Sequence, residues 1–392
     1  AEEDDGQVSY HNTGAVYVYN LDGTGEVKIT ASDGARNDDL GRSVAIGGGK
    51  VVAGAPGHNT HGAIYIYDLD GTNETKVMPN LYQYAYFGYS VAIGENKIAV
   101  GAFNENPGDV SGYQSSGAIF LYDMDGSNEI KIMPSDRAEY DSFGWSVAIG
   151  NGKVAVGARG PTGASDVPKS NSPNGSVYVY NLDGTGEIKI TASDGAAMDT
   201  FGASVTIMDG KILVGAPMTY SGGNGAIYMY DLDGSNEVKI TASDGAVGDY
   251  FGDASAIVQG SVAGNVVGGS IDTTNRWTNG SDKVYNLQNY QGTPSWNTGS
   301  TVLEISGTDV TAGTGDAVAS LRLMASSPRD DNDNGDQAGA VYLFNTDGSN
   351  EVKITLSDGE TWDAFGSTVA AGHGKIAVGA YGDDDQGSNA GA

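Results

Sequence analysis

The sequence predicts an all-β protein made of seven copies of one four-stranded antiparallel unit. Three observations predict this class: one phrase recurs along the chain, each copy holds four β-rich runs, and no segment has a convincing helical period. The phrase is clearest in Gly-Ala-Ile-Tyr-Ile-Tyr-Asp-Leu-Asp-Gly, which begins at Gly62. The same phrase begins at Gly14, Gly117, Gly175, Gly225 and Gly339, and a degenerate version lies near Lys283.

The spacing of these starts favours a ring of small sheets. The starts are about 50 residues apart, and a period of this size with four strands per copy is typical of a β-propeller. One copy cannot bury its apolar faces alone. We therefore predict a single seven-bladed β-propeller domain over residues 1–392, in which the copy at 270–335 is degenerate, having diverged or acquired an insertion. The main structural alternative is a long β-solenoid, although solenoid repeats are usually shorter.

The copy at 175–217 shows how the residues specify each strand. Residues 177–180 are β-branched and aromatic and residues 187–191 alternate polar with apolar side chains, so both are expected to be strands, joined into a hairpin by an Asp-Gly turn. A polar loop follows, and 201–207 is expected to be the third strand. Residues 211–217 are nearly all apolar, which predicts a fourth strand buried on both faces.

The two ends of the chain predict how the ring closes. The first copy begins with a hairpin at 16–30, whereas the last copy ends with a strand pair at 365–381. We expect the N-terminal hairpin to complete the sheet that the C-terminal strands begin, because this pairing removes two exposed sheet edges. Residues 388–392 look like the start of a further copy, so a longer natural chain is an open alternative.

Composition excludes several classes of partner and site. Of the 392 residues, 50 are Asp or Glu and 20 are Lys or Arg, which gives a formal net charge of −30. Such a surface repels phosphate backbones and anionic membranes, so we expect neither nucleic-acid binding nor membrane insertion. The chain has no cysteine, which excludes disulfides, thiolate nucleophiles and cysteine zinc sites and suits an exported or virion protein.

Two short signatures recur at fixed places in the copies. A Phe-Gly pair precedes the third strand, and Gly-Ala-Pro or a variant closes the fourth. The pairs begin at Phe87, Phe143, Phe201, Phe251 and Phe365, and the closing triplets begin at Gly54, Gly101, Gly157, Gly215 and Gly379. These residues resemble FG-GAP repeats, the units of the integrin α-subunit propeller, and the copies are also similar to repeat arrays of marine bacteria and their viruses. The resemblance covers residues 14–381 and implies a β-propeller with an adhesion or interaction role.

The chain departs from this family pattern where many members bind calcium. Those members carry a loop of the form Asp-x-Asp-x-Asp-Gly-x-x-Asp between the third and fourth strands. Here that segment is a short turn, as in Asn151-Gly152, and calcium needs about six to eight oxygen ligands. The first copy also has Leu40-Gly41 in place of Phe-Gly. We therefore expect no metal and no other cofactor.

Acidic clusters leave calcium as the alternative cofactor. The hairpin turns repeat Asp-x-Asp-Gly, but turn chemistry alone explains both residue types there. In the loop at 330–336, Asp331, Asp333 and Asp336 are the candidate calcium ligands, although runs of charge are more often exposed loops. His58 and His61 share a loop that we expect to be an exposed surface loop.

Four aromatic residues are the candidate binding residues. Tyr89 and Trp145 follow Phe-Gly in consecutive copies, where later copies have alanine, aspartate or serine. Trp277 and Trp296 lie in the irregular sixth copy. Exposed aromatic planes stack on sugar rings or anchor a protein partner. The alternative is that these two tryptophans only cover a gap in the degenerate copy.

Together these features predict a non-enzymatic interaction or adhesion module in the extracellular space, at the cell surface or on a virion. Its expected partner is a surface glycan or a protein, including copies of itself, and the loops at 103–116, 159–174 and 381–392 are expected to line one rim. No catalytic motif occurs, and no catalytic residue is assigned. Two alternatives stay open: an architectural subunit of a filament or virus particle, and a polysaccharide lyase or glycosidase whose site is assembled from distant copies.

Overall fold

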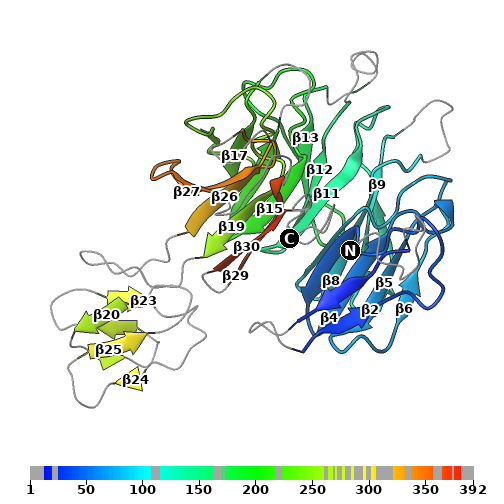
Figure 1. The fold of residues 1–392 in the computed structure, drawn as a ribbon, viewed down its shortest axis with the longest axis horizontal. Coiled ribbons are helices and arrows are strands. Elements are labelled where there is room, and N and C mark those ends of the chain that lie inside the picture. The colour runs from blue at the N-terminus through cyan, green and yellow to red at the C-terminus, as the bar shows by residue number, and fades with distance from the viewer. Residues whose placement is uncertain are drawn as a thin grey trace. The chain divides into compact units, whose positions relative to one another are not determined.

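The structure is a computed structural model, and its chain divides into two compact units, Ala1–Ser255 and Ala256–Ala392. The described residues are 13–19, 25–106, 115–161, 170, 173–217, 223–259, 264–267, 270–271, 276–278, 284–286, 295–296, 302–305, 321–331, 337–355, 364–372 and 375–380. Each unit consists of antiparallel β-sheets (Figure 1). Within the described residues the one helical element is the 3-10 turn η1 (His58–Thr60), so the all-β prediction is confirmed.

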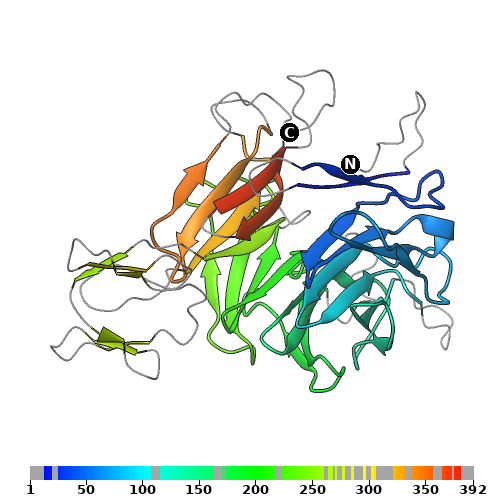
Figure 2. The same ribbon diagram turned by 90° about the horizontal axis from the view of Figure 1, so that it is seen from below.

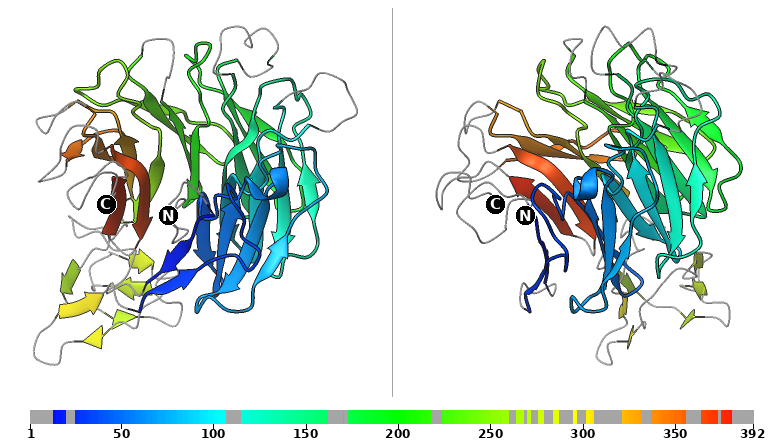
Figure 3. Two further views of the ribbon diagram at one scale, coloured as in Figure 1. Left: turned by 45° about the vertical axis from the view of Figure 1, so that its right-hand side comes forward. Right: turned by 90° about the vertical axis from the view of Figure 1, so that its right-hand side faces the viewer.

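The first unit contains one hairpin and four complete four-stranded sheets, which follow one another from blue to green in Figure 3. The hairpin pairs β1 (Val16–Val18) with β2 (Val27–Ile29). The sheet strands are β3 (Ser43–Gly47), β4 (Lys50–Ala55), β5 (Ala63–Asp68) and β6 (Thr75–Val77); β7 (Ser90–Gly94), β8 (Lys97–Ala102), β9 (Ala118–Asp123) and β10 (Ile130–Ile132); β11 (Phe143–Gly150), β12 (Lys153–Ala158), β13 (Ser176–Asn181) and β14 (Ile188–Ile190); and β15 (Ser204–Met208), β16 (Lys211–Ala216), β17 (Ala226–Asp231) and β18 (Val238–Ile240).

Each sequence copy is divided between two sheets. In the copy that begins at Gly175, β13 and β14 belong to one sheet, whereas β15 and β16 belong to the next. The polar loop between β14 and β15 connects the two sheets. Within each sheet the second and third strands, which come from consecutive copies, are hydrogen-bonded neighbours. Strand β16 is buried from its second residue onward, as predicted. Strand β15 begins later than predicted, because Phe201 makes only an isolated parallel bridge to Gly175.

Apolar cores fill the spaces between neighbouring sheets of the first unit. One core combines Ile119 and Leu121 of β9 with Phe143, Val154 and other residues of the following sheet. Phe87, Phe143 and Phe201 of the Phe-Gly pairs are fully buried in these cores. Burial of large side chains in such clusters is the main force that holds the sheets together.

Polar contacts reinforce the same junctions between sheets. Ser32, which lies before β3, donates its hydroxyl and its backbone N–H to the Glu74 carboxylate at 2.5 and 2.9 Å. The same double contact joins Ser135 with Glu187 and Ser193 with Glu237. Hydrogen bonds to a charged acceptor are stronger than neutral ones, so each contact helps to fix one sheet against the next.

The second unit contains one four-stranded sheet, one strand pair and two three-stranded sheets. The four-stranded sheet has the order β19-β26-β27-β28, and Figure 2 shows its orange strands beside the red pair β29-β30. The strands are β19 (Ser255–Gln259), which begins at the last residue of the first unit, β20 (Gly264–Val267), β21 (Ser270–Ile271), β22 (Arg276–Thr278), β23 (Val284–Asn286), β24 (Ser295–Trp296), β25 (Val302–Ile305), β26 (Leu321–Ser327), β27 (Ala340–Asn345), β28 (Val352–Ile354), β29 (Phe365–Gly372) and β30 (Lys375–Ala380).

The topology around 270–335 differs from a degenerate seventh copy and fits the alternative of an insertion. The first two strands of this sheet are β19 and β26, which residues 260–320 separate in the sequence. In the other complete sheets a two-residue turn joins the first two strands. The described strands inside this interval form the sheets β20-β25-β24 and β21-β22-β23. Residues 260–320 are therefore an insertion within one sheet. The described repeat strands therefore form five four-stranded sheets and the two strand pairs β1-β2 and β29-β30.

Candidate functional site

Two positions in each repeat lie next to each other at one end of the first two strands of a sheet. One position follows Phe-Gly, and the other follows Gly-Ala. In the second repeat they are Tyr89 and Phe103, whose strands are joined by a 3.0 Å hydrogen bond from Gly88 N–H to Gly101 C=O. In β11 the register shifts between Phe143 and Ser146, so Trp145 lies in a β-bulge, a feature that re-aims side chains.

These positions from the first three repeats, together with Tyr86, form one aromatic–arginine cluster, which comprises Arg42, Tyr86, Tyr89, Phe103, Trp145 and Arg159. The Tyr89 and Trp145 ring centroids are 4.7 Å apart, and Phe103 lies 4.6 and 4.9 Å from the two rings. Tyr86 stacks on Phe103 at 5.3 Å with an interplanar angle of 4°. The four aromatic side chains are half-buried, so each keeps some apolar surface in contact with water.

Two guanidinium groups flank these rings. The Arg159 guanidinium carbon lies 3.4 Å from the Trp145 ring centroid, and that of Arg42 lies 5.0 Å from the Tyr89 centroid. Arg42 also donates from Nη2 to the Tyr89 hydroxyl at 3.1 Å. Burial lowers the pKa of Arg159, and the electrostatic interactions with Tyr89 and Asp253 oppose that shift. Arginine stays protonated at neutral pH, so the cluster combines two positive charges with apolar ring surface.

The structure brings together two of the four candidate aromatic residues. Tyr89 and Trp145 are in contact, whereas Trp277 lies on β22 and Trp296 on β24, in two different sheets of the second unit. Sequence reasoning missed the contributions of Arg42, Phe103 and Arg159. The signal was present, because Phe103 and Arg159 replace the proline of Gly-Ala-Pro in consecutive copies. Among the predicted rim loops, residues 107–114, 162–169, 171–172 and 381–392 lie outside the described residues.

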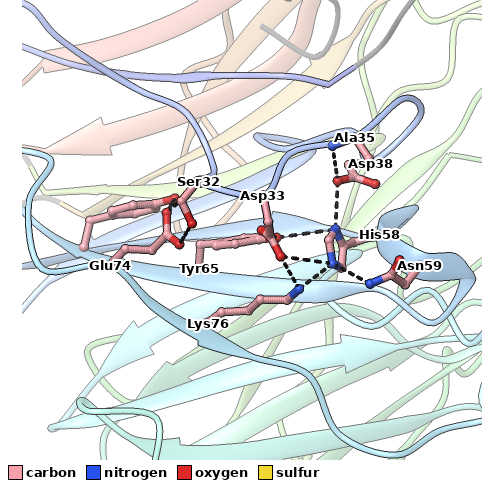
Figure 4. A network of polar contacts seen from close by, with 10 residues as sticks. Ser32, Asp33, Ala35, Asp38, His58, Asn59, Tyr65, Glu74 and Lys76 are labelled. Carbon is pink, nitrogen blue, oxygen red and sulfur yellow. Dashed lines mark hydrogen bonds and ion pairs between the residues drawn. The ribbon is translucent and has the colours of Figure 1, made fainter.

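A second polar network surrounds His58, which is 2% exposed and therefore not the surface-loop residue that we predicted (Figure 4). His58 Nδ1 lies 2.7 Å from Asp38, to which it donates, and Nε2 accepts from Lys76. Lys76 also donates to Asp33 at 2.7 Å, and the Tyr65 hydroxyl donates to the same carboxylate at 2.7 Å.

This network has a structural role at a junction between sheets. The bonds from Lys76 and Tyr65 lower the pKa of Asp33. The same arrangement recurs where Asp136 accepts from Tyr178 and Lys189, and where Asp194 accepts from Tyr228 and Lys239. Because this contact recurs at successive junctions between sheets, a structural role accounts for its Asp, Tyr and Lys residues, and no ligand is needed to explain them.

The acidic hairpin turns use their carboxylates within the turn. Asp70 accepts from the Thr72 N–H at 3.0 Å and from the Thr72 hydroxyl at 2.6 Å, and Asp68 pairs with Lys50. Of the candidate calcium ligands, Asp331 accepts from the Gln337 N–H at 2.8 Å. Asp333 and Asp336 lie outside the described residues. In the part of the chain that is described, no three His, Cys, Asp or Glu side chains converge on one point, as a metal site requires.

Comparison with known families agrees with the repeat pattern. A family model described as FG-GAP repeat matches residues 24–67, 127–180, 185–230 and 349–392. The first three matches each run from the last strand of one sheet into the third strand of the next, which is the division between sheets described above. No curated protein sequence matches this chain. None of the described helical residues forms a segment long and apolar enough to cross a membrane.

Proposed function

This chain belongs to the FG-GAP repeat family, and from that premise we propose that it is a non-enzymatic binding module that acts outside the cell. FG-GAP repeats commonly mediate protein or ligand binding and are typical of extracellular proteins. The finer proposal is that the protein is displayed on a cell surface or a virion, where it binds a surface glycan or a protein.

The aromatic–arginine cluster is the observation that carries this proposal. The recurrent fold explains the buried Phe residues and the polar networks between sheets, but not a concentration of aromatic and arginine side chains at positions that most other repeats fill with alanine, aspartate, serine or proline. Aromatic and arginine side chains are the types most enriched at the energetic centres of binding interfaces. One fold supports many functions, and the function depends on the residues of a particular site. A binding site built on a rigid repeat array agrees with this rule.

A binding comparison of single variants tests the cluster. We expect Trp145→Ala and Tyr89→Ala each to weaken binding of the full chain to its glycan on an array by about tenfold or more, because each removes a central aromatic contact. Tyr19→Ala is the matched control, since Tyr19 is 50% exposed on the hairpin β1-β2 and lies outside the cluster.

Three outcomes would contradict the proposal. Equal binding by all four proteins would exclude the cluster as the site. Release of reducing ends from the bound glycan would favour a polysaccharide lyase or glycosidase. Self-assembly in solution without any ligand binding would favour an architectural subunit.

We also propose that the repeats close into a ring, with the hairpin β1-β2 completing the sheet of β29-β30. Every complete sheet has four strands, while these two elements supply two strands each. The sheet topology supports six blades, because the predicted seventh copy is an insertion in the sheet that starts with β19. One domain over residues 1–392 follows from this closure.

Ring closure predicts a specific cross-link. Ala155 lies opposite Val179 where β12 pairs with β13, and the aligned residues of β30 and β1 are Ala377 and Val18. Because directly opposed residues on antiparallel strands lie within disulfide range, we expect Val18→Cys/Ala377→Cys to form an intramolecular disulfide on oxidation. The chain has no other cysteine, so mass spectrometry and thiol titration report this bond alone.

The matched control is Ala155→Cys/Val179→Cys, whose two positions pair within one described sheet. If this control oxidises while the Val18/Ala377 variant keeps free thiols, the proposed closure is wrong. Disulfide-linked dimers of the Val18/Ala377 variant would instead indicate that closure occurs between two chains.

We propose that the fold needs no metal, with calcium at Asp331, Asp333 and Asp336 as the alternative. In the first unit, the turns between the first and second strands of the complete sheets are two residues long and are too short to supply the ligands of a calcium loop. A chelator should then leave the melting temperature unchanged, whereas a large drop would support the calcium alternative, because a ligand that binds only the folded state stabilises it.

A further inference from the structure

Arg159 has hydrogen-bonding capacity that the described residues do not use. Its Nε atom is buried, and no described residue accepts from it. Its guanidinium lies over Trp145 without an ion pair to any carboxylate of the described chain. A buried donor without a partner is costly, and such groups in a native structure call for an explanation.

Many lysines of the same chain, by contrast, have a carboxylate partner. Eight of them pair with a carboxylate: Lys50, Lys76, Lys97, Lys131, Lys189, Lys211, Lys239 and Lys353. Carboxylates are abundant, since Asp and Glu number 50. Arg159 is held on a tryptophan and makes no ion pair with a described carboxylate, although the charge of Asp253 acts on it from beyond ion-pair distance, so it is suited to an anion that comes from outside the chain.

Resting on the proposed binding function, we propose that the aromatic–arginine cluster selects a glycan that carries a carboxylate. Arg159 donates to the carboxylate from its planar fork of N–H groups, and the half-buried surfaces of Tyr89 and Trp145 contact the C–H groups of the sugar ring. A guanidinium matches a carboxylate with two parallel hydrogen bonds, and its cost is lowered here because the group is already desolvated and immobilised on Trp145.

Charge limits the ligand to few carboxylates near the bound sugar. The net charge of −30 repels a polyanion at long range, whereas the Arg159 contact acts only over a short distance. An oligosaccharide that ends in a single uronic acid satisfies both conditions. The aromatic surface favours this sugar over an acidic peptide, because several adjoining rings match a saccharide better than a flexible backbone.

A matched pair of ligands tests the proposal on the intact protein. One is an oligosaccharide that ends in glucuronic acid, and the other is its carboxyl-reduced counterpart, which ends in glucose. By titration calorimetry we expect the acid to bind about ten- to a hundredfold more tightly, as expected for hydrogen bonds to a charged group. Arg159→Gln should abolish this preference while weak binding of the neutral sugar remains.

Two further variants make the test specific. Arg36→Gln removes the same charge from an exposed loop and should keep the full preference. Arg159→Lys keeps the charge without the planar fork and should reduce the preference, and it replaces Arg159→Gln if that variant fails to fold. Equal affinity of the wild-type protein for both sugars overturns the proposed acid selectivity but leaves the binding function standing. Binding of neither sugar, or only of a peptide ending in aspartate, overturns the glycan ligand itself.

Discussion

Replacing Gly117 with alanine is expected to destabilise the first unit by more than about 4 kcal/mol, enough to unfold many domains. Gly117 has φ +86°, and a Cβ added there would lie 2.0 Å from the Phe143 carbonyl oxygen of the next sheet. It also forms the parallel bridge to Phe143 through which one sheet meets the next. Neither backbone can move without breaking that bridge, so the cost combines a strained conformation with a steric clash.

Gly152→Ala is the matched control for this substitution. Gly152 has a similar φ of +73°, but no atom lies within 4 Å of the added Cβ. Its expected cost is therefore only the conformational term of about 1–2 kcal/mol. Chemical unfolding of the full chain, followed by circular dichroism, measures both variants. Similar unfolding midpoints for the two variants would show that the contact with Phe143 does not hold the sheets together.

The strands could be predicted from the sequence because the residues of each copy favour them through local chemistry. The alternation in 187–191, the apolar run in 211–217 and the Asp-Gly turn between strands all act over a few residues, and the structure has strands or a turn at each place. Repetition then strengthened a weak local signal. Local residue types also predicted the short turns at the place where many family members have a calcium loop.

Prediction was weaker where the structure depends on contacts distant in sequence. The insertion at 260–320 separates β19 from its partner β26, so nothing local shows that Val284–Asn286 belongs to a different kind of sheet from the repeats. The candidate binding residues were also predicted only in part. Tyr89 and Trp145 stood out by their own identity, but Arg159 becomes informative only once its guanidinium is seen on Trp145.

The other large expected effect concerns the phenylalanine of the Phe-Gly pair. Phe143 is fully buried, and its ring lies edge-on to Tyr178 at 5.4 Å and to Tyr180 at 6.2 Å. Truncation removes the ring from the core between two sheets, where rigid neighbours cannot fill the space. We therefore expect Phe143→Ala to lower the free energy of unfolding by about 3–5 kcal/mol, measured by equilibrium denaturation.

The chain itself supplies the control for this substitution. Leu40 occupies the equivalent position of the first repeat, where it is 1% exposed and makes the corresponding parallel bridge to Gly14. The bridge therefore needs a large apolar side chain rather than an aromatic one, and Phe143→Leu should cost about 1–1.5 kcal/mol. If leucine proved as damaging as alanine, the edge-on contacts with the two tyrosines, and not the filled volume, would be what the Phe-Gly pair contributes to the fold.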